Sequence, residues 1–103
     1  MKPETILQLD PLVHAPTRLA ILSILIGVEE ANFTYLKEAI NTTDGNLSTH
    51  LSKLETGGLI TIKKSFKGKK PQTVCKITSK GKNALTTYLN QLEKIVAIKD
   101  ESK

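Results

Sequence analysis

The spacing of apolar side chains changes abruptly near the middle of this chain. Before the pair Gly57-Gly58, leucines recur three and four residues apart, which predicts a helix with a single apolar stripe. These leucines are Leu47, Leu51 and Leu54. After the glycines, Ile60 and Ile62 alternate with polar residues, which is the period of a β-strand. Because a helix that ends at two glycines leads almost directly into a strand, the chain must combine helices with a sheet.

Two further helices are expected before this one. The first spans residues 16–26, with a proline suited to its first turn and Gly27 at its end. The second begins after Thr34, whose side-chain oxygen would accept a backbone N–H two or three residues later. A polar turn over 41–43 then leads to the leucine-striped helix, which we expect Asp44 to cap. Two helices joined by a short polar turn are typical of a helix-turn-helix.

The second half of the chain predicts a hairpin and one long helix. A second alternating stretch over 74–77 pairs with the strand after the glycines, and the loop 66–71 between them carries a glycine for the turn. Thr78 is expected to cap a helix over about 79–99, which would be about 30 Å long. The predicted fold class is α+β: a winged helix-turn-helix with a three-helix core, a two-stranded β-hairpin wing and a long C-terminal helix, in one domain over 1–103.

The charge distribution favours a polyanionic partner. The net charge is +5, and residues 57–92 contain eight lysines and no acidic residue. A one-signed face on a small domain suggests binding to nucleic acid, although a solvated run of charge is the alternative interpretation.

Enzymatic, metal and membrane functions find no support in the sequence. Cys75, His14 and His50 have no zinc-ligand spacing, and the chain has neither a phosphate-binding glycine loop nor a nucleophile motif. We therefore expect no enzyme activity, no cofactor and no bound metal. The sequence has no apolar run of ~18–20 residues and no secretory signal, so we expect a cytoplasmic protein without a membrane partner.

Several motifs resemble those of small winged-helix regulators from bacteria and archaea. The run 44–55 followed by Gly58-Leu59-Ile60 is similar to their recognition helix and first wing strand, and 64–73 with Thr78-Ser79-Lys80-Gly81 is similar to their wing and the start of their last helix. The opening segment, 9–19, also resembles theirs. The resemblance covers about residues 9–86 and is to single-domain relatives of the MarR and ArsR transcriptional regulators. It implies a homodimeric DNA-binding repressor or activator, and places Arg18 at a structural position.

The face of the 44–56 helix opposite its leucines is the candidate DNA-contacting surface. It carries short hydroxyl and amide side chains, which would let the helix enter a major groove about 12 Å wide. In this interpretation Asn46 contacts adenine, while the wing lysines bind phosphates or lie in the minor groove and supply affinity more than sequence choice. The full set of candidates is Thr34, Gly45, Asn46, Ser48, Thr49, Ser52, Lys53, Lys67, Lys69 and Lys70. A plain solvated face is the alternative.

The last helix and the first 15 residues are the candidate dimer interface, because a helix this long extends beyond so small a core. The expected contacts are Ile6, Leu9, Leu85, Tyr88, Leu89, Leu92, Ile95 and Val96. A two-fold dimer would meet successive major grooves about 34 Å apart, so its operator in double-stranded DNA would be an inverted repeat. The same apolar stripe could instead pack wholly within one domain.

Three other residues carry a thiol or an imidazole group. Cys75 is expected to be a small core residue, with a redox role as the alternative. His50 is expected to pack and to hydrogen-bond to the preceding helix or the backbone, with a phosphate contact as the alternative. His14 shows no partner in the sequence.

Two rival functions share the fold. A winged-helix protein-interaction module would not need a lysine-rich tip free of acids. A non-specific architectural DNA binder would use the same lysines without preferring a sequence. The sequence names no small-molecule effector.

Overall fold

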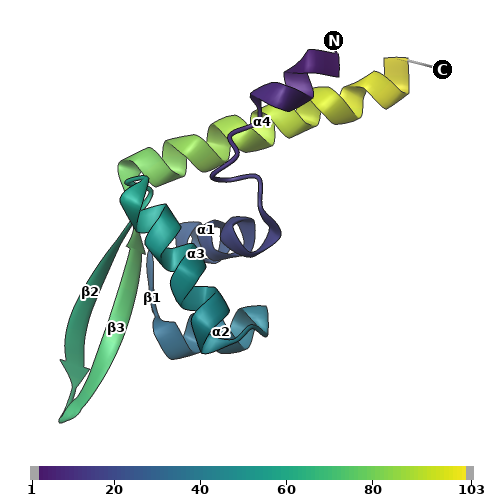
Figure 1. Cartoon of the computed structure of the whole chain (residues 1–103). Helices are drawn as coiled ribbons and strands as arrows, with labels where there is room; N and C mark the ends of the chain where they lie inside the picture. The colour runs from purple at the N-terminus through teal and green to yellow at the C-terminus, as the bar shows by residue number, and fades with distance from the viewer. Residues whose placement is uncertain (1–2, 102–103) are drawn as a thin grey trace.

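The computed structural model describes residues 3–101 and has the winged-helix architecture expected from the sequence (Figure 1). In chain order the elements are the 3-10 helix η1 (Pro3–Gln8), α1 (Pro16–Val28), β1 (Glu30–Asn32), α2 (Phe33–Ile40), α3 (Asp44–Thr56), β2 (Ile60–Lys67), β3 (Lys70–Ile77) and α4 (Ser79–Glu101). The three strands form one antiparallel sheet in the order β1-β3-β2. The fold is therefore α+β, with helices on one side of a small sheet and a hairpin that extends away from them.

The core forms where the helices and the base of the sheet meet. The stripe Leu47, Leu51 and Leu54 of α3 is buried, as its spacing predicts. It lies in one cluster with Leu22 and Leu25 of α1, and the cluster is closed by side chains from the base of the wing and from α4. Because every large aliphatic side chain of α3 points inward, its polar residues are left on the outer face.

Two expected N-cap residues are wrong, one by two positions and the other by one. Asn32, not Thr34, caps α2, and its side chain accepts the N–H of Tyr35 at 2.7 Å. Thr43, not Asp44, caps α3 and accepts the N–H of Asn46 at 3.1 Å. In both cases an earlier polar residue with an extended backbone reaches the third N–H of the helix, which is the geometry that capping requires.

The end of α1 also differs from the expectation. Gly27 lies inside the helix, which continues to Val28 and ends at Glu29 with φ of +69°. The N–H of Glu29 bonds to the carbonyl of Leu25, so the left-handed backbone closes the last turn without a glycine.

The sheet is larger than the sequence indicates. The wing strands extend through Lys67 and Lys70, so the expected loop over 66–71 shrinks to the two-residue turn Gly68-Lys69, where Gly68 has φ of +65°. A two-residue hairpin turn favours positive φ, which glycine adopts without strain. The strand β1, which pairs with the second half of β3, was not expected because three residues are too few to show an alternating pattern.

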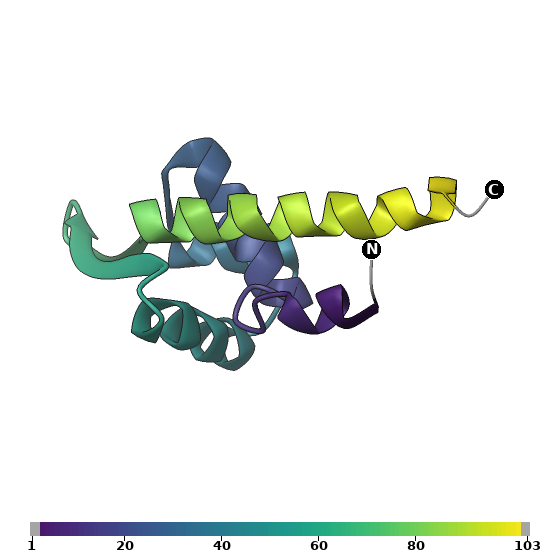
Figure 2. The same ribbon diagram turned by 90° about the horizontal axis from the view of Figure 1, so that it is seen from above.

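α4 projects well beyond the rest of the domain (Figure 2). The side chain of Thr78 caps it, accepting the N–H of Gly81 at 3.0 Å while donating to the carbonyl of Gly58 at 2.7 Å, as the sequence predicted for the cap. η1 lies alongside this helix, and the molecule measures 60 × 25 × 21 Å. Within residues 3–101, none of the helices combines the length and apolar character needed to cross a membrane.

Candidate nucleic-acid interface

The outward face of α3 is polar and open to solvent. Every residue that the sequence assigned to it is exposed: Gly45, Asn46, Ser48, Thr49, Ser52 and Lys53. Asp44 at the start of the helix forms an ion pair with Lys37 of α2, with 2.9 Å between Oδ1 and Nζ. This pair offsets the one carboxylate in the first turn of α3, where a negative charge would oppose a phosphate ligand.

The hydroxyl groups on this face differ in how they are engaged. Thr49 donates its hydroxyl to the carbonyl of Gly45 at 2.9 Å, and Asn46 donates from Nδ2 to Oγ1 of Thr42 at 2.7 Å. The second bond orients the amide of Asn46 and leaves its oxygen and one N–H for a further partner. Ser48 and Ser52 have no side-chain partner among the described residues, so their hydroxyls are available to a ligand.

A continuous hollow connects α3 to the wing. A small cavity of about 160 Å³ is lined by residues that include Ser48 and Ser52 of α3, Ile62 of β2 and Thr73 of β3. It shares Phe33 and Thr73 with a neighbouring hollow of about 370 Å³, which Thr34, Lys64 and Pro71 also line. We call these two together the α3–wing hollow. The start of α2, the outer face of α3 and one face of the hairpin thus border a single concave surface.

The pairing of the wing strands divides their lysines between two faces. Lys64 lies opposite Thr73 and shares its strand face with Ile60 and Ile62, so it borders the α3–wing hollow. Lys67 lies opposite Lys70 on the other face, and Lys69 is in the turn. Lys64 was not among the predicted site residues, although its even spacing from Ile60 and Ile62 in the sequence indicates this face.

The wing is strongly cationic. Lys63, Lys64, Lys67, Lys69 and Lys70 are all exposed, and none has a carboxylate partner among the side chains that the structure describes. The other end of the hairpin is anchored to the helices, since the N–H of Ile62 donates to Oε2 of Glu55 at 3.2 Å. Unpaired lysines on an anchored hairpin can bind phosphate without first breaking an ion pair.

Arg18 and His50 brace α3 from behind. The guanidinium of Arg18 donates to the carbonyl of Leu12 at 2.6 Å and to that of Pro11 at 3.2 Å, and lies 3.1 Å from Nδ1 of His50. Arg18 is therefore structural, as its place in the resemblance implied. The expected partner of His50 was wrong, because its ring bonds to α1 and not to the preceding helix or the backbone. Burial lowers the pKa of His50 below its ordinary value of 6.5, and the charges of Arg18 and then Lys53 lower it further.

Cys75 and His14 lie outside the outer face of α3 and the tip of the wing. Cys75 is fully buried, and burial, followed by the nearby charge of Glu55, raises the pKa of its thiol to about 11. A thiol that stays protonated inside the core is a poor nucleophile, which supports the core role expected for Cys75. Within the described residues, no three histidine, cysteine or acidic side chains gather where they could hold a metal ion. His14, which showed no partner in the sequence, lies with Nδ1 2.7 Å from the hydroxyl of Tyr88.

The candidate dimer residues separate into two groups. Leu9, Leu85 and Tyr88 are buried within the protomer, so they leave almost no surface for a second chain, and we correct the expectation for these three. Ile6, Leu89 and Val96 are exposed, at 49%, 44% and 67%, and Leu92 and Ile95 are partly buried. Leu7, at 85% exposed, was missed, because the broken helical pattern of the first residues did not show which side faces out.

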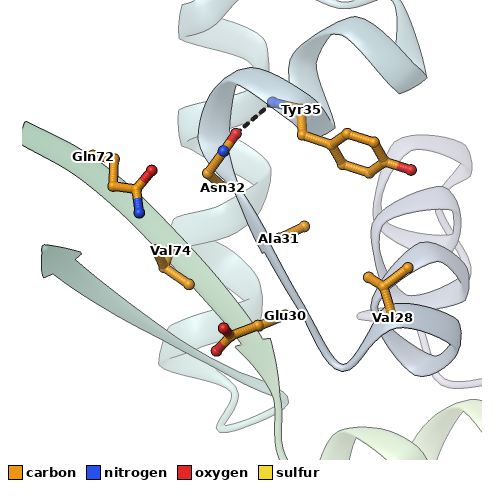
Figure 3. Close-up of a pocket in the computed structure, with 7 residues that line it drawn as sticks. All are labelled: Val28, Glu30, Ala31, Asn32, Tyr35, Gln72 and Val74. Atoms are coloured by element: carbon orange, nitrogen blue, oxygen red, sulfur yellow. Dashed lines mark hydrogen bonds between the residues drawn. The ribbon is translucent and has the colours of Figure 1, made fainter. Parts of the chain in front are cut away.

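A second hollow of about 450 Å³ lies beside β1 (Figure 3). Glu30, Tyr35, Gln72 and Val74 are among the residues around it, and the bond from the Tyr35 N–H to Asn32 forms part of its wall. Its one described charged group, Glu30, has the wrong sign for phosphate. This carboxylate would repel a phosphate placed in the hollow.

Comparison with known proteins agrees with this geometry. Residues 17–96 match the model of a family described as winged helix DNA-binding domain. An uncharacterized protein of Methanocaldococcus jannaschii is 43% identical over 79 residues, which are 77% of this chain and 86% of that protein.

Solved structures show the same similarity. The structure of a transcriptional regulator homologue protein from Pyrococcus horikoshii OT3 matches with a TM-score of 0.88 and 27% identity, over 94% of this chain and 98% of that one. NadR in complex with 4-hydroxyphenylacetate shares the fold at a TM-score of 0.68 and 17% identity, over 96% of this chain and 73% of that one. An ArsR family transcriptional regulator does so at 0.57 and 21%, over 94% and 95%.

Proposed function

The chain belongs to the winged helix DNA-binding domain family, and we propose on that basis that it is a transcriptional regulator that binds specific sequences of double-stranded DNA as a homodimer. The observation that carries this proposal is the α3–wing hollow. In it, the free hydroxyls of Ser48 and Ser52 lie on the same concave surface as the cationic hairpin. A duplex presents the matching pair of features, with base edges in a groove and phosphates along its rims.

In this proposal α3 occupies the major groove. Short side chains on its outer face let the helix backbone approach the bases, and serine, threonine and asparagine all bond to base edges or phosphates. The start of α2, with Thr34, would lie against the adjacent phosphate backbone, because it borders the same hollow. Lys53, one turn before the end of α3, would contact a phosphate.

The wing would lie along the neighbouring backbone or minor groove. Lys64 faces the hollow, while Lys67, Lys69 and Lys70 flank the tip. Lysine is a point charge without the forked geometry of arginine, so these residues are expected to supply affinity and position more than sequence choice.

The proposed dimer uses α4 and η1. Ile6, Leu7, Leu89 and Val96 expose apolar surface along the projecting helix and the segment beside it. A second copy related by a two-fold axis would cover this surface with the same residues. Its two α3 helices would then contact an inverted repeat whose half-sites lie about 10 base pairs apart. Such a protein would act in the cytoplasm, where the DNA of a bacterium or archaeon is found.

Selection of bound duplexes from a random pool tests the proposal. We expect enrichment of an inverted repeat, bound with an affinity that falls steeply as salt is raised. Binding without enrichment of any sequence would identify a non-specific architectural protein. Failure to retain any duplex, even at low salt, would instead favour a protein-interaction module.

A further inference from the structure

The tip of the wing carries a large apolar side chain among its lysines. Phe66 is 71% exposed, and its partner across the hairpin is Pro71. Lys67, Lys69 and Lys70 surround this pair in sequence. The lysines are sufficient to attract phosphates, and a phenyl ring adds nothing to that attraction. The ring is therefore suited to the apolar part of the same ligand, which in a nucleic acid is the face of a base or the sugar.

The strand register fixes the direction in which this ring points. Phe66 lies two residues beyond Lys64 on the same strand, so both side chains emerge from the same face of the hairpin. Pro71 also lines the α3–wing hollow. The Phe66–Pro71 pair therefore forms the outer end of the surface on which α3 lies, whereas Lys67 and Lys70 emerge from the opposite face.

We propose that Phe66, supported by Pro71, is an apolar wedge that enters the minor groove beside each half-site and partly unstacks one base step. The inference rests on the proposed function, since it assigns a role within the same DNA interface. Phenylalanine and proline are among the side chains that proteins insert between base steps from the minor groove. The lysines on either side of the wedge would bind the phosphates of the two groove walls.

This role adds a source of sequence preference that needs no hydrogen bond to a base. Pyrimidine–purine steps such as TA and CA/TG unstack and kink most easily. A wedge at the tip of each wing therefore favours such a step at a fixed distance outside the bases that α3 contacts. The preference would appear at positions that no polar side chain reaches.

Fluorescence of 2-aminopurine tests the wedge. A duplex taken from the selection described above carries 2-aminopurine in place of adenine, at one position after another, and the whole chain is added to saturation. We expect the wild type to raise the fluorescence at one step in the flank of each half-site, where stacking is lost. Phe66→Ala should abolish this rise and weaken binding about tenfold, while Phe66→Leu should keep most of it.

The control is the double substitution Lys69→Ala and Lys70→Ala. It should weaken binding and yet leave the fluorescence rise intact at saturation, because the wedge is still present. Since Phe66 is exposed, its variants should unfold at the same temperature as the wild type. A fluorescence rise that Phe66→Ala leaves unchanged would overturn the wedge alone, as would a bound wild type without any rise. A wild type that binds no duplex would instead refute the proposed function.

Discussion

His50 connects the pH of the solution to the stability of the fold. The neutral ring accepts a hydrogen bond from Arg18, and its pKa is lowered from 6.5 mainly by burial. The unfolded chain therefore binds a proton at this residue more readily than the folded chain does. Well above pH 6.5 the ring is neutral in both states and has no effect on the pH dependence of stability. As the pH falls through and below that value, protonation favours the unfolded chain and the free energy of unfolding decreases.

We therefore expect the free energy of unfolding to fall between pH 7.5 and pH 5.5, and to fall less in a His50→Gln variant. Urea unfolding at both pH values measures the difference. His50 is partly exposed, so the effect is modest in size. An equal fall in wild type and variant would show that His50 does not carry the dependence.

A single capping side chain determines where α2 begins. Asn32 accepts the N–H of Tyr35, whereas Thr34 makes no side-chain hydrogen bond within the described part of the chain. Asn32→Ala should lower the free energy of unfolding by about 1 kcal/mol. Thr34→Ala, its matched control in the same turn, should leave it nearly unchanged. Urea titrations of both variants test this, and an equal loss in the two would contradict the assignment.

These caps also show what a sequence can and cannot predict about single residues. The helices were predicted because their apolar spacing is set by the core. The caps were missed because several neighbouring residues, such as Thr42, Thr43 and Asp44, could all serve. Only the backbone angles decide which of them reaches the third N–H.

Among the elements, the wing has two faces, and the face on which a lysine lies should decide how much that lysine contributes to the affinity for DNA. Lys64 borders the α3–wing hollow, while its neighbour Lys63 is opposite Val74 on the other side of the hairpin. Lys64→Ala should weaken binding to all duplexes and reduce the slope of log affinity against log salt by about two, because a dimer loses one phosphate contact in each protomer. Lys63→Ala should change the slope less. Anisotropy titrations over a range of salt test this, and the reverse order would place the duplex on the opposite face.

The elements themselves were largely predictable, and so was the exposed face of α3, because both follow from periodicity. The length of the wing strands could not be predicted, because lysines and a proline occur both in loops and in edge strands. Lys64 was not predicted as a site residue for a related reason. The strand face that buries Ile60 is exposed to solvent further along β2, at Lys64. The even spacing of Lys64 from Ile60 and Ile62 indicates its strand face, but only the register with β3 shows which residue lies across from Lys64.

For the molecule as a whole, the proposed dimer depends on α4. Leu89 and Val96 are seven residues apart on one side of this helix and are both exposed. Replacing both with glutamate should convert a dimer to a monomer, because buried unpaired charges are costly. The matched control replaces Asn90 and Ala97, which have the same spacing on an adjacent face. Sedimentation equilibrium measures the mass, and a monomeric wild type would contradict the proposed interface.

The burial of Leu9, Leu85 and Tyr88 shows the limit of sequence reasoning at this scale. A continuous apolar stripe on a long helix can face its own core, a second chain or both, and periodicity does not distinguish them. The structure divides the stripe: Leu85 and Tyr88 are buried, Leu92 and Ile95 are partly buried against the core, and Leu89 and Val96 are exposed.

In the proposed complex, the outer face of α3 contacts base edges. A pair of selections from one random duplex pool tests it most directly, with the wild type and with a variant that carries both Ser48→Ala and Ser52→Ala. These hydroxyls are exposed, so the variant should fold as the wild type does. We expect the variant to lose base preference at matching positions in both half-sites while keeping the salt dependence of binding. An identical enriched sequence, bound with identical affinity by both proteins, would contradict the account.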